Sequence, residues 1–303
     1  MSKPNIHVAI ALLFHQNKVL VGWREAKQHQ GNKHEFPGGK VEVGETPADA
    51  CRREVFEEVG IGIQQWHAFD IICHEYDDVI VNLHIFQAAV PAALLKDIQL
   101  PWTWFSRPQL LELNFPQANR GIVQRLAWQQ AIKVSDDLKH LANLPKQKLL
   151  YWRVEPNAAC KVELSEYCIE QLGQVIVNWE LWKQLNTIQQ HAIAAIHLKQ
   201  SQLMQLQKGD LKVGQRYIAA CHDIVSAQHA QQIGCEAILL SPVLATTTHQ
   251  DATPLGWEKF QQIAEFVDIP VFALGGVVPT DLEQAQKHHA YGLAGIRQFE
   301  SIQ

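Results

Sequence analysis

The sequence contains none of the patterns that mark a disulfide framework or a zinc site. Its six cysteines include no CxxC pair, which is typical of buried thiols in a reducing cytosol. Its 15 histidines form no HxxH or HExxH pattern, which argues against bound zinc. We therefore expect a cytoplasmic protein that has neither disulfides nor zinc.

The chain also lacks a long apolar run and an excess of positive charge. The apolar run 7–14 is too short to span a bilayer and has neither a basic leader nor a cleavage site, so we interpret it as a core strand. The formal net charge of −5 and the pI of about 6.3 argue against a basic, polymer-binding surface. We expect neither a membrane nor a nucleic acid polymer among the partners.

What the chain does have is enough apolar residues for two hydrophobic cores. It is 303 residues long and 47% of these are hydrophobic, which suits two domains of ordinary size. The pattern of apolar runs changes near residue 131. We therefore expect one domain over residues 1–130 and a second over residues 131–303.

The stretch GKVEVGETPADACRREVFEEVGI, residues 39–61, is the most informative part of the sequence. Thr46 is suited to cap a helix and Pro47 to its first turn, where a missing N–H costs nothing. Asp49 adds a negative charge near the positive end of the helix. Gly60 is suited to end the helix in a left-handed turn. The stretch therefore predicts a helix of about four turns.

Two faces of this predicted helix have different chemistry. Cys51, Val55 and Val59 recur every four residues and form an apolar stripe that faces a core. Three carboxylates share another face, because Glu54, Glu57 and Glu58 are spaced i, i+3 and i+4. Such a face repels itself unless a hard divalent cation such as Mg²⁺ binds there. Arg53 can reach Glu57 one turn later and hold its carboxylate.

Fixed residues at fixed spacing give this stretch a resemblance to a known family. It is similar to the complete Nudix box, whose matching positions are Gly39, Glu45, Arg53, Glu54, Glu57, Glu58 and Gly60. The flanking segments 36–40 (FPGGK) and 115–119 (FPQAN) resemble the MutT branch, which hydrolyses 8-oxo-dGTP. The resemblance covers roughly the first 130 residues and implies a Nudix α/β/α sandwich.

The resemblance implies a metal site and a catalytic group. The implied metal ligands are the carboxylates of Glu54, Glu57 and Glu58 with a carbonyl near Gly38, and the ion is Mg²⁺ or alternatively Mn²⁺. Arg53 belongs to the catalytic residues with these glutamates. The general base stays open, because the glutamate that MutT proteins place before the tryptophan segment is replaced by Ile98, with Asp97 beside it. Either Asp97 or a glutamate of the box acts as the base.

The resemblance also implies the groups that bind the nucleotide. Arg24, which follows the second predicted strand, contacts the nucleotide or is a surface arginine. Glu35, Phe36 and Lys40 flank the double glycine at 38–39, which lets a ligand approach the backbone closely. Asn119 either reads the edge of an oxidised guanine with two hydrogen bonds or caps the helix expected over 121–128.

The remaining elements of the first domain follow from alternation and turn residues. Strands are expected over 6–13 and 18–23 with a hairpin turn at 15–17, and over 66–74 and 79–90 with a turn at 76–78. The polar segment 25–34 is interpreted as a loop, and 108–111 as a short helix. Trp102 and Trp104 share one face of an expected strand, where Trp104 either packs in a core or stacks on a base.

From residue 131 short apolar runs alternate with helical patterns, which predicts parallel βα units. The eight runs indicate a small (β/α)₈ barrel. They cover residues 131–134, 149–154, 174–179, 192–198, 216–222, 237–243, 270–275 and 290–296.

This second domain resembles the thiamine phosphate synthase and TenI family. The resemblance rests on Arg153, Asn178, the pair His197-Leu198, the segment SPV at 241–243 with 246–249, the segment PLGW at 254–257 and the glycines after the last two strands. It implies a phosphate site formed by Arg153, Gly275, Gly276, Ala294 and Gly295, where backbone N–H groups bind a phosphorylated ligand. The alternative is that these glycines serve only tight turns.

Side chains that this family needs for catalysis are replaced. Trp179 and Gln202 occupy the positions of the two aspartates that bind Mg²⁺ in the synthase. Thr247, Thr248 and His249 replace the lysines of a loop, and Pro242 replaces the histidine of the TenI tautomerases. Only Asp223 and Asp251 are nearby acids that could substitute. We therefore expect ligand binding without thiamine phosphate synthesis.

The sequence predicts a Mg²⁺-dependent nucleotide pyrophosphohydrolase that acts on an oxidised guanine nucleotide. The alternatives are a Nudix enzyme for another nucleotide or for a thiamine-related diphosphate, and a barrel that only binds or regulates.

Overall fold

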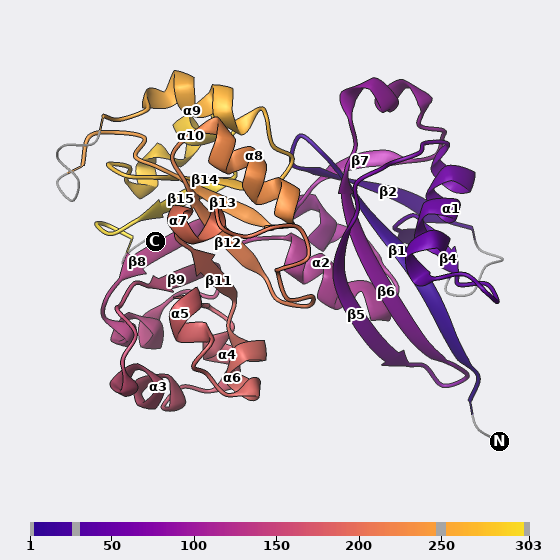
Figure 1. Ribbon diagram of the computed structural model, residues 1–303, viewed down its shortest axis with the longest axis horizontal. Helices are drawn as coiled ribbons and strands as arrows, with labels where there is room; N and C mark the ends of the chain where they lie inside the picture. Colours follow the sequence, from indigo (N-terminus) through magenta and orange to yellow (C-terminus); the bar gives the residue numbers. More distant parts are fainter. Residues whose placement is uncertain (1–2, 26–30, 247–252, 300–303) are drawn as a thin grey trace. The chain divides into compact units, whose positions relative to one another are not determined.

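The computed structural model describes residues 3–25, 31–246 and 253–299. The chain forms two compact units, Met1–Trp128 and Gln129–Gln303, and each is described by itself (Figure 1). In the described ranges, no helix is long and apolar enough to cross a membrane.

A seven-stranded sheet forms the centre of unit 1. Its main path runs β3-β2-β1-β6-β5, while β4 pairs with β1 and β7 pairs with β2. β1 and β6 are parallel, and the other pairs are antiparallel. The strands are β1 (Asn5–His15), β2 (Lys18–Arg24), β3 (Lys33–Glu35), β4 (Gly38–Lys40), β5 (His67–Glu75), β6 (Ile80–Ala89) and β7 (Thr103–Ser106).

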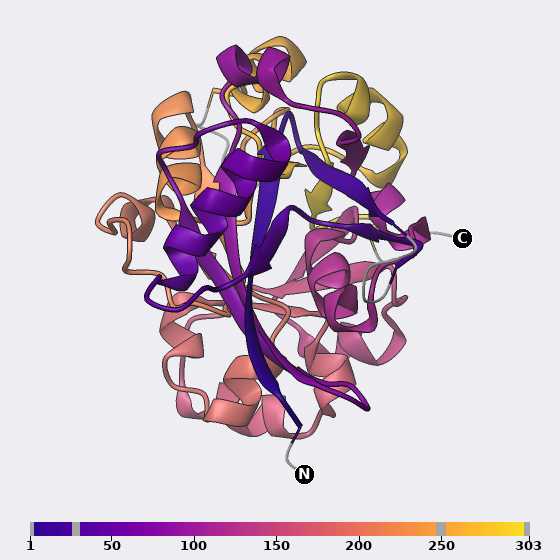
Figure 2. The same cartoon turned by 90° about the vertical axis from the view of Figure 1, so that its right-hand side faces the viewer.

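Helices cover both faces of this sheet, so unit 1 is an α/β/α sandwich. They are α1 (Pro47–Val59), α2 (Arg120–Leu126) and the 3₁₀ segments η1 (Ala92–Asp97), η2 (Pro108–Glu112) and η3 (Gln117–Asn119). Alternate residues of β1 divide the core, as a strand with period two requires. Ala9, Ala11 and Leu13 pack with α1, whereas Ile10, Leu12 and Phe14 pack with α2. Figure 2 shows α1 lying across the strands.

The structure confirms most of the elements expected in unit 1 and corrects three. Trp102 lies before β7, which begins at Thr103, so it does not share a strand face with Trp104. The hairpin turn has left-handed residues at Gln16 and Asn17, with φ of 46° and 61°, which matches the right-handed twist of its strands. The expected loop 25–34 is wrong at its end, because Lys33 and His34 pair with β2. The short helix at 108–111 is a 3₁₀ segment. Residues 26–30 lie outside the described residues.

Unit 2 is a closed barrel of eight parallel strands, as the sequence predicts. The order around the barrel is β10-β11-β12-β13-β14-β15-β8-β9. The strands are β8 (Ala131–Ser135), β9 (Lys148–Trp152), β10 (Val175–Asn178), β11 (Ala195–Leu198), β12 (Tyr217–Cys221), β13 (Ala237–Leu240), β14 (Val271–Leu274) and β15 (Gly292–Gly295).

Short helices and 3₁₀ segments follow the barrel strands. They are η4 (Leu138–Asn143), α3 (Ala158–Ser165), α4 (Ile169–Leu172), α5 (Trp179–Trp182), α6 (Thr187–Ala192), α7 (Gln200–Leu203), α8 (Ile224–Ile233), α9 (Gly256–Ala264), η5 (Pro279–Asp281) and α10 (Leu282–Lys287). Apolar residues of both layers meet in one large core, for example Trp152 of β9, Leu240 of β13 and Phe260 of α9.

The expected runs of the barrel contain the strands but are too long at several ends. The run 192–198 is a strand only from Ala195, since Ala192 ends α6. Trp179 begins α5 because Asn178 caps that helix. Apolar residues at the ends of a buried strand continue into buried helices, so hydrophobicity alone does not mark the boundary.

Candidate active site

Local sequence signals set the bounds of α1. The Thr46 hydroxyl accepts a hydrogen bond from the Asp49 N–H at 3.2 Å, and Pro47 occupies the first turn. Gly60 ends the helix with φ of 85°, and its N–H donates to the Phe56 carbonyl. Ala50, Cys51, Val55 and Val59 are buried. The predicted start, end and apolar stripe of this helix are confirmed, and the acidic face is thereby turned away from the core.

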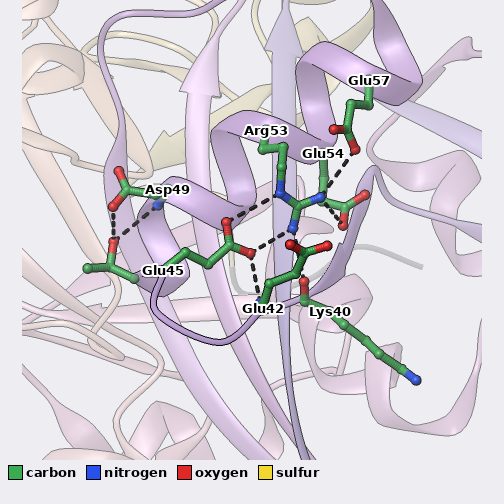
Figure 3. Close-up of polar contacts among 8 residues, drawn as sticks. Lys40, Glu42, Glu45, Asp49, Arg53, Glu54 and Glu57 are labelled. Carbon is green, nitrogen blue, oxygen red and sulfur yellow. Dashed lines mark hydrogen bonds and ion pairs between the residues drawn. The ribbon is translucent and has the colours of Figure 1, made fainter.

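Arg53 gathers the acidic side chains of the helix and of the segment before it (Figure 3). Its Nη2 donates to Glu45 Oε1 at 2.7 Å and its Nε donates to Glu45 Oε2 at 3.3 Å. Its Nη1 donates to Glu54 Oε1 at 2.8 Å and to Glu57 Oε2 at 3.2 Å. The predicted contact with Glu57 is present. A planar guanidinium can make such a forked arrangement, whereas a lysine cannot.

Glu45 is the partner that the spacing alone did not assign. Both of its carboxylate oxygens accept hydrogen bonds from Arg53, and its Oε1 also accepts from the Glu42 N–H at 2.8 Å. These hydrogen bonds, with that from Arg53 the largest cause, lower the pKa of Glu45. The Lys40 carbonyl accepts from Arg53 Nη2 at 3.1 Å. The signal in the sequence was the fixed interval from Gly39 to Glu45, and the fold explains it because Arg53 fastens this segment to α1.

Gly38 and Gly39 make close contacts with the protein itself. A Cβ on Gly38 would lie 2.1 Å from the Ala9 carbonyl oxygen of β1, and the φ of Gly38 is 148°. A Cβ on Gly39 would lie 2.1 Å from Glu54 Oε1. The two glycines therefore let β4 lie against both β1 and the Glu54 carboxylate. This is a role that the expectation of close ligand approach did not include.

The Glu58 side chain points toward β4, which contains Gly38 and Gly39. Its Oε2 accepts from the Gly38 N–H at 3.0 Å. Burial raises the pKa of Glu58 to about 7, the Gly38 N–H opposes this shift, and the charges of Glu35 and Glu54 raise the pKa further. A carboxylate that is costly to ionise beside other carboxylates is stabilised by a cation.

The donors on this face suit a hard divalent cation. They are carboxylates, with the Gly38 carbonyl as a further oxygen in the sequence-based set, and oxygen ligands are those that Mg²⁺ prefers. As the side chains lie, no three or more His, Cys, Asp or Glu residues of the described ranges are grouped so that they could hold a metal ion. Glu54 and Glu57 point toward Arg53, and Glu58 points toward the Gly38 N–H. The donor chemistry therefore fits a cation, although these side chains are paired with other groups.

The expected nucleotide-binding residues have different surroundings. Arg24 Nε donates to Glu35 Oε2 at 2.7 Å, and the two side chains are 30% and 20% exposed. Phe36 is buried and stacks on Phe115 at 4.8 Å between ring centroids. The Lys40 side chain points away from the Arg53 cluster in Figure 3. Arg24 and Glu35 thus form a polar pair, while the ring of Phe36 belongs to the core.

Asn119 and Asp97 lie outside α1, in the 3₁₀ segments η3 and η1. Asn119 is 7% exposed and its side chain makes no capping hydrogen bond to α2, so the structure does not support the alternative of a helix cap. Asp97 is exposed at the end of η1. Its carbonyl lies 3.0 Å from the place of a Cβ on Gly60, at the C-terminal end of α1. Within the described ranges, no hydrogen bond or ion pair joins Asp97 to the box carboxylates.

The barrel has a cavity of about 780 Å³ where strands β12 to β15 end. Four of the five expected phosphate-site residues line it, namely Arg153, Gly275, Gly276 and Gly295. Ala294 does not line it and is fully buried within β15. Gly275 and Gly276 have φ of 96° and 72°, so their turn needs glycine and presents its backbone to the cavity. His222 also lines the cavity, and its Nδ1 lies 2.6 Å from the Ser241 carbonyl.

The acids that follow β10 and β12 are engaged with other groups. Glu180, which the sequence analysis did not consider, binds Lys183 at 2.8 Å and Gln202 at 3.1 Å. Asp223 caps α8 through Ser226 and contacts Gln200. Trp179 lies under Lys183, whose Nζ is 4.6 Å from the ring centroid. Residues 247–249, which replace the loop lysines, and Asp251, the other acid that could bind the ion, lie outside the described residues.

Comparison with known proteins identifies relatives of each unit. A family model described as NUDIX domain matches residues 3–126. The chain is 34% identical over 124 residues to the 8-oxo-dGTP diphosphatase of Escherichia coli (strain K12), which covers 40% of this chain and 95% of that protein. It is 38% identical over 87 residues to the 8-oxo-dGTP diphosphatase of Proteus vulgaris, which covers 28% of this chain and 78% of that protein.

The relatives of the barrel are matched over a smaller share. A family model described as thiamine monophosphate synthase matches residues 159–299. The chain is 39% identical over 80 residues to the putative thiamine-phosphate synthase 2 of Aquifex aeolicus (strain VF5), and this covers 26% of this chain. The match spans only 43% of the length of that relative.

Proposed function

Because this chain belongs to the Nudix hydrolases of the 8-oxo-dGTP diphosphatase (MutT) type, and is thus an enzyme that hydrolyses nucleoside triphosphates, we propose that its substrate is 8-oxo-dGTP. The products are 8-oxo-dGMP and pyrophosphate, and the reaction depends on Mg²⁺ or, in its place, Mn²⁺. Residues 1–130 carry this activity. The observation that carries the proposal is the acidic face of α1, on which Arg53 binds Glu45, Glu54 and Glu57.

The residues on this face have distinct roles in the proposed reaction. Glu54, Glu57 and Glu58, with the Gly38 carbonyl, would hold the metal ion. The bound ion supplies positive charge that neutralises phosphate oxygens as water attacks phosphorus. Arg53 fixes Glu54 and Glu57 to the segment that carries Glu45, so the carboxylates are positioned before substrate binds.

The remaining roles concern the base of the nucleotide and the proton of the attacking water. Asn119 presents donors and an acceptor that suit the edge of 8-oxoguanine. Arg24, paired with Glu35, contacts the nucleotide, as does the backbone near Phe36 and Lys40. Asp97 or a box glutamate accepts the proton. Asp97→Asn separates these two cases, because it leaves kcat unchanged if a box glutamate is the base.

A substrate screen of the whole chain tests this proposal. We expect pyrophosphate release from 8-oxo-dGTP to exceed that from dGTP in kcat/KM, to require Mg²⁺ and to stop when EDTA is added. Release from dGTP, another nucleotide or a thiamine-related diphosphate at a higher kcat/KM than from 8-oxo-dGTP would contradict the substrate and favour the alternative Nudix activities. Absence of any hydrolysis with either Mg²⁺ or Mn²⁺ would contradict the metal site.

A second function is favoured for residues 131–303 by the cavity with its glycine rim. We infer that the barrel binds a phosphorylated ligand of thiamine or thiazole phosphate chemistry and does not synthesise thiamine phosphate. Backbone N–H groups at Gly275, Gly276 and Gly295 suit a phosphate. Synthesis needs a metal-bound diphosphate, and Trp179 and Gln202 supply no carboxylate for the ion.

The whole chain is suitable for testing the barrel. It is incubated with the pyrimidine diphosphate, the thiazole phosphate and Mg²⁺, and thiamine phosphate is assayed. We expect no accumulation beyond the protein concentration. Accumulation over many turnovers would overturn the inference, and loss of that activity in Glu180→Gln or Asp223→Asn would identify the replacement ligand.

A further inference from the structure

The C-terminal end of α1 is fastened by a segment that follows it by almost 40 residues in the sequence. The last carbonyls of a helix have no partner within the helix. In α1 the Phe56 carbonyl accepts from Gly60, the Val59 carbonyl accepts from the Gln99 N–H at 3.0 Å, and the Glu58 carbonyl accepts from Trp102 Nε1 at 2.8 Å. We call residues 97–102 the clamp segment, because it supplies two of these three partners.

The indole of Trp102 is held in place by the sheet. Trp102 packs against the core beneath α1. A Cβ on Gly22 of β2 would lie only 2.7 Å from the indole Cζ3. Glycine at position 22 therefore leaves the space in which the ring lies, and the ring in turn directs its N–H to the helix end. Gly60 allows an equally close approach, since a Cβ there would lie 2.8 Å from Gln99 Nε2.

The helix turn that receives these bonds is the one that carries the chemistry. Glu57 and Glu58 lie in the last turn of α1, and helix ends fray when their backbone groups are not bonded. Glu58 also accepts from the Gly38 N–H through its side chain. The clamp segment begins at Asp97, so it connects the helix end that carries the box glutamates with the other candidate for the general base.

We propose that Trp102 is a positioning residue for the hydrolysis, which holds the last turn of α1 and the clamp segment in register through its Nε1–H. This inference rests on the proposed function of the acidic face. Its effect is on turnover and not on nucleotide affinity, because the ring is bonded to the catalytic helix. A misplacement of about 1 Å of catalytic groups is enough to slow an enzyme by an order of magnitude or more.

The first test compares two tryptophans of the same region. Trp102→Phe removes the N–H and keeps an aromatic ring, and we expect kcat for 8-oxo-dGTP to fall about tenfold with KM changed less than about twofold. The Mg²⁺ concentration for half-maximal activity is expected to rise severalfold. Trp104→Phe is the matched control, because Trp104 packs on the same core and no hydrogen bond joins its indole to α1 in the described ranges. Its kcat is expected to stay within about twofold of the wild type.

The second test reaches the same ring from another strand. Gly22→Ala pushes the indole through its new Cβ and leaves the N–H intact, so it is expected to lower kcat in the same direction. In a double-mutant cycle the two substitutions should be clearly non-additive, because both act through one contact. Gly22→Ala also carries the test if Trp102→Phe does not fold.

Amide hydrogen exchange provides a readout that does not depend on turnover. In Trp102→Phe the amides of Gly60 and Gln99 should exchange at least about tenfold faster, whereas they should be unchanged in Trp104→Phe. Equal kcat in the two variants, additive effects in the cycle, or unchanged exchange at both amides would overturn the role of Trp102. If the wild type hydrolyses another nucleotide or a thiamine-related diphosphate instead, the proposed substrate fails, and the same comparison is made with the compound that is hydrolysed.

Discussion

The acidic face of α1 and the glycine rim of the barrel cavity solve the same problem by different means. Both are proposed to act on phosphate groups. The helix would do so through a cation held by carboxylates that Arg53 positions, whereas the rim would use backbone N–H groups at positions that require glycine. The helix and the segment before it carry every residue of the Nudix box. At the rim the glycines are present, while the resemblance to the synthase family implies that Trp179 and Gln202 replace its two aspartates.

A backbone site and a metal site respond differently to replacement of residues. A backbone site depends on φ and on space, so it persists as long as Gly275 and Gly276 do. A metal site depends on charge at particular side chains, and a single replacement removes a ligand. Glu180, which follows β10, is paired with Lys183 and Gln202. We therefore expect turnover from unit 1 and binding alone from unit 2.

Replacing one carboxylate in each unit gives the largest expected difference. Glu57→Gln should leave the fold intact and lower kcat for 8-oxo-dGTP by at least about a hundredfold, because a neutral amide binds Mg²⁺ poorly. Glu57 is half exposed, so the substitution creates no buried defect. Steady-state pyrophosphate release at saturating Mg²⁺ measures the effect.

Glu180→Gln is the matched control in the barrel. It makes the same chemical change in a carboxylate that is already paired with Lys183 and Gln202. Hydrolysis by this variant should stay within about twofold of the wild type. A near-normal rate for Glu57→Gln as well would contradict a metal site on this face of α1.

The sequence was sufficient where short-range rules decide the structure. Thr46, Pro47 and Gly60 bound the helix as predicted, and the four-residue spacing of Cys51, Val55 and Val59 identified its buried side. The eight apolar runs predicted the barrel, because buried parallel strands are apolar on both faces. These features depend on residues that are close in the chain.

The sequence was insufficient where distant segments meet. The bond from Trp102 to the helix end joins residues 44 positions apart, and no spacing rule relates them. The link from Gln202 to Glu180 likewise appears only once two strands are adjacent in the barrel. The site residues themselves remain predictions, since the structure positions their side chains without testing their roles. Asn119 is an example, for which the capping alternative lost support but base reading stays to be measured.

Asn119→Ala separates recognition of the base from binding of phosphate. The preference for 8-oxo-dGTP over dGTP should fall by about 1–3 kcal/mol, the scale of a two-bonded base contact. Both nucleotides should still be hydrolysed, because the acidic face is unchanged. The ratio of the two kcat/KM values is the measurement, and an unchanged ratio assigns Asn119 to the core.

The glycine rim is tested by adding a methyl group to it. Gly275→Ala places a Cβ 2.9 Å from Pro242 at a φ of 96°, so it should deform the rim and weaken inorganic phosphate binding about tenfold. Gly209→Ala is the control, because Gly209 has a similar φ of 99° with nothing within 4 Å of the added Cβ. Both variants incur the same kind of backbone strain. The amide signals of Gly276 and Gly295 report phosphate binding, and equal affinities in the two variants would contradict a phosphate site at this rim.

The smallest expected effect is a loss of stability at low pH that affects unit 2 and not unit 1. In the barrel His197 is buried, and Tyr151 Oη lies 2.9 Å from its Nδ1. Burial lowers the pKa of His197 to about 3, and the charges of Lys199 and Arg153 contribute. Its unfolded pKa is about 6.5. The unfolded chain therefore takes up a proton below pH 6.5 that the folded barrel does not, so stability is lost as the pH falls from about 6.5 toward 3. Between pH 6.5 and 5.5 this group should cost the barrel about 1 kcal/mol.

His197→Gln should remove that loss while an amide can still pair with Tyr151. The free energy of opening is measured by hydrogen exchange at Ile196 and Ile218, which lie on neighbouring barrel strands, with correction for the intrinsic pH dependence of exchange. The wild type should lose about 1 kcal/mol more than the variant between pH 6.5 and 5.5 at these amides. Amides of Ala11 and Leu12 in unit 1 should show no difference between the two proteins. An equal loss in the variant at Ile196 and Ile218 would mean that His197 does not stay neutral in the folded barrel.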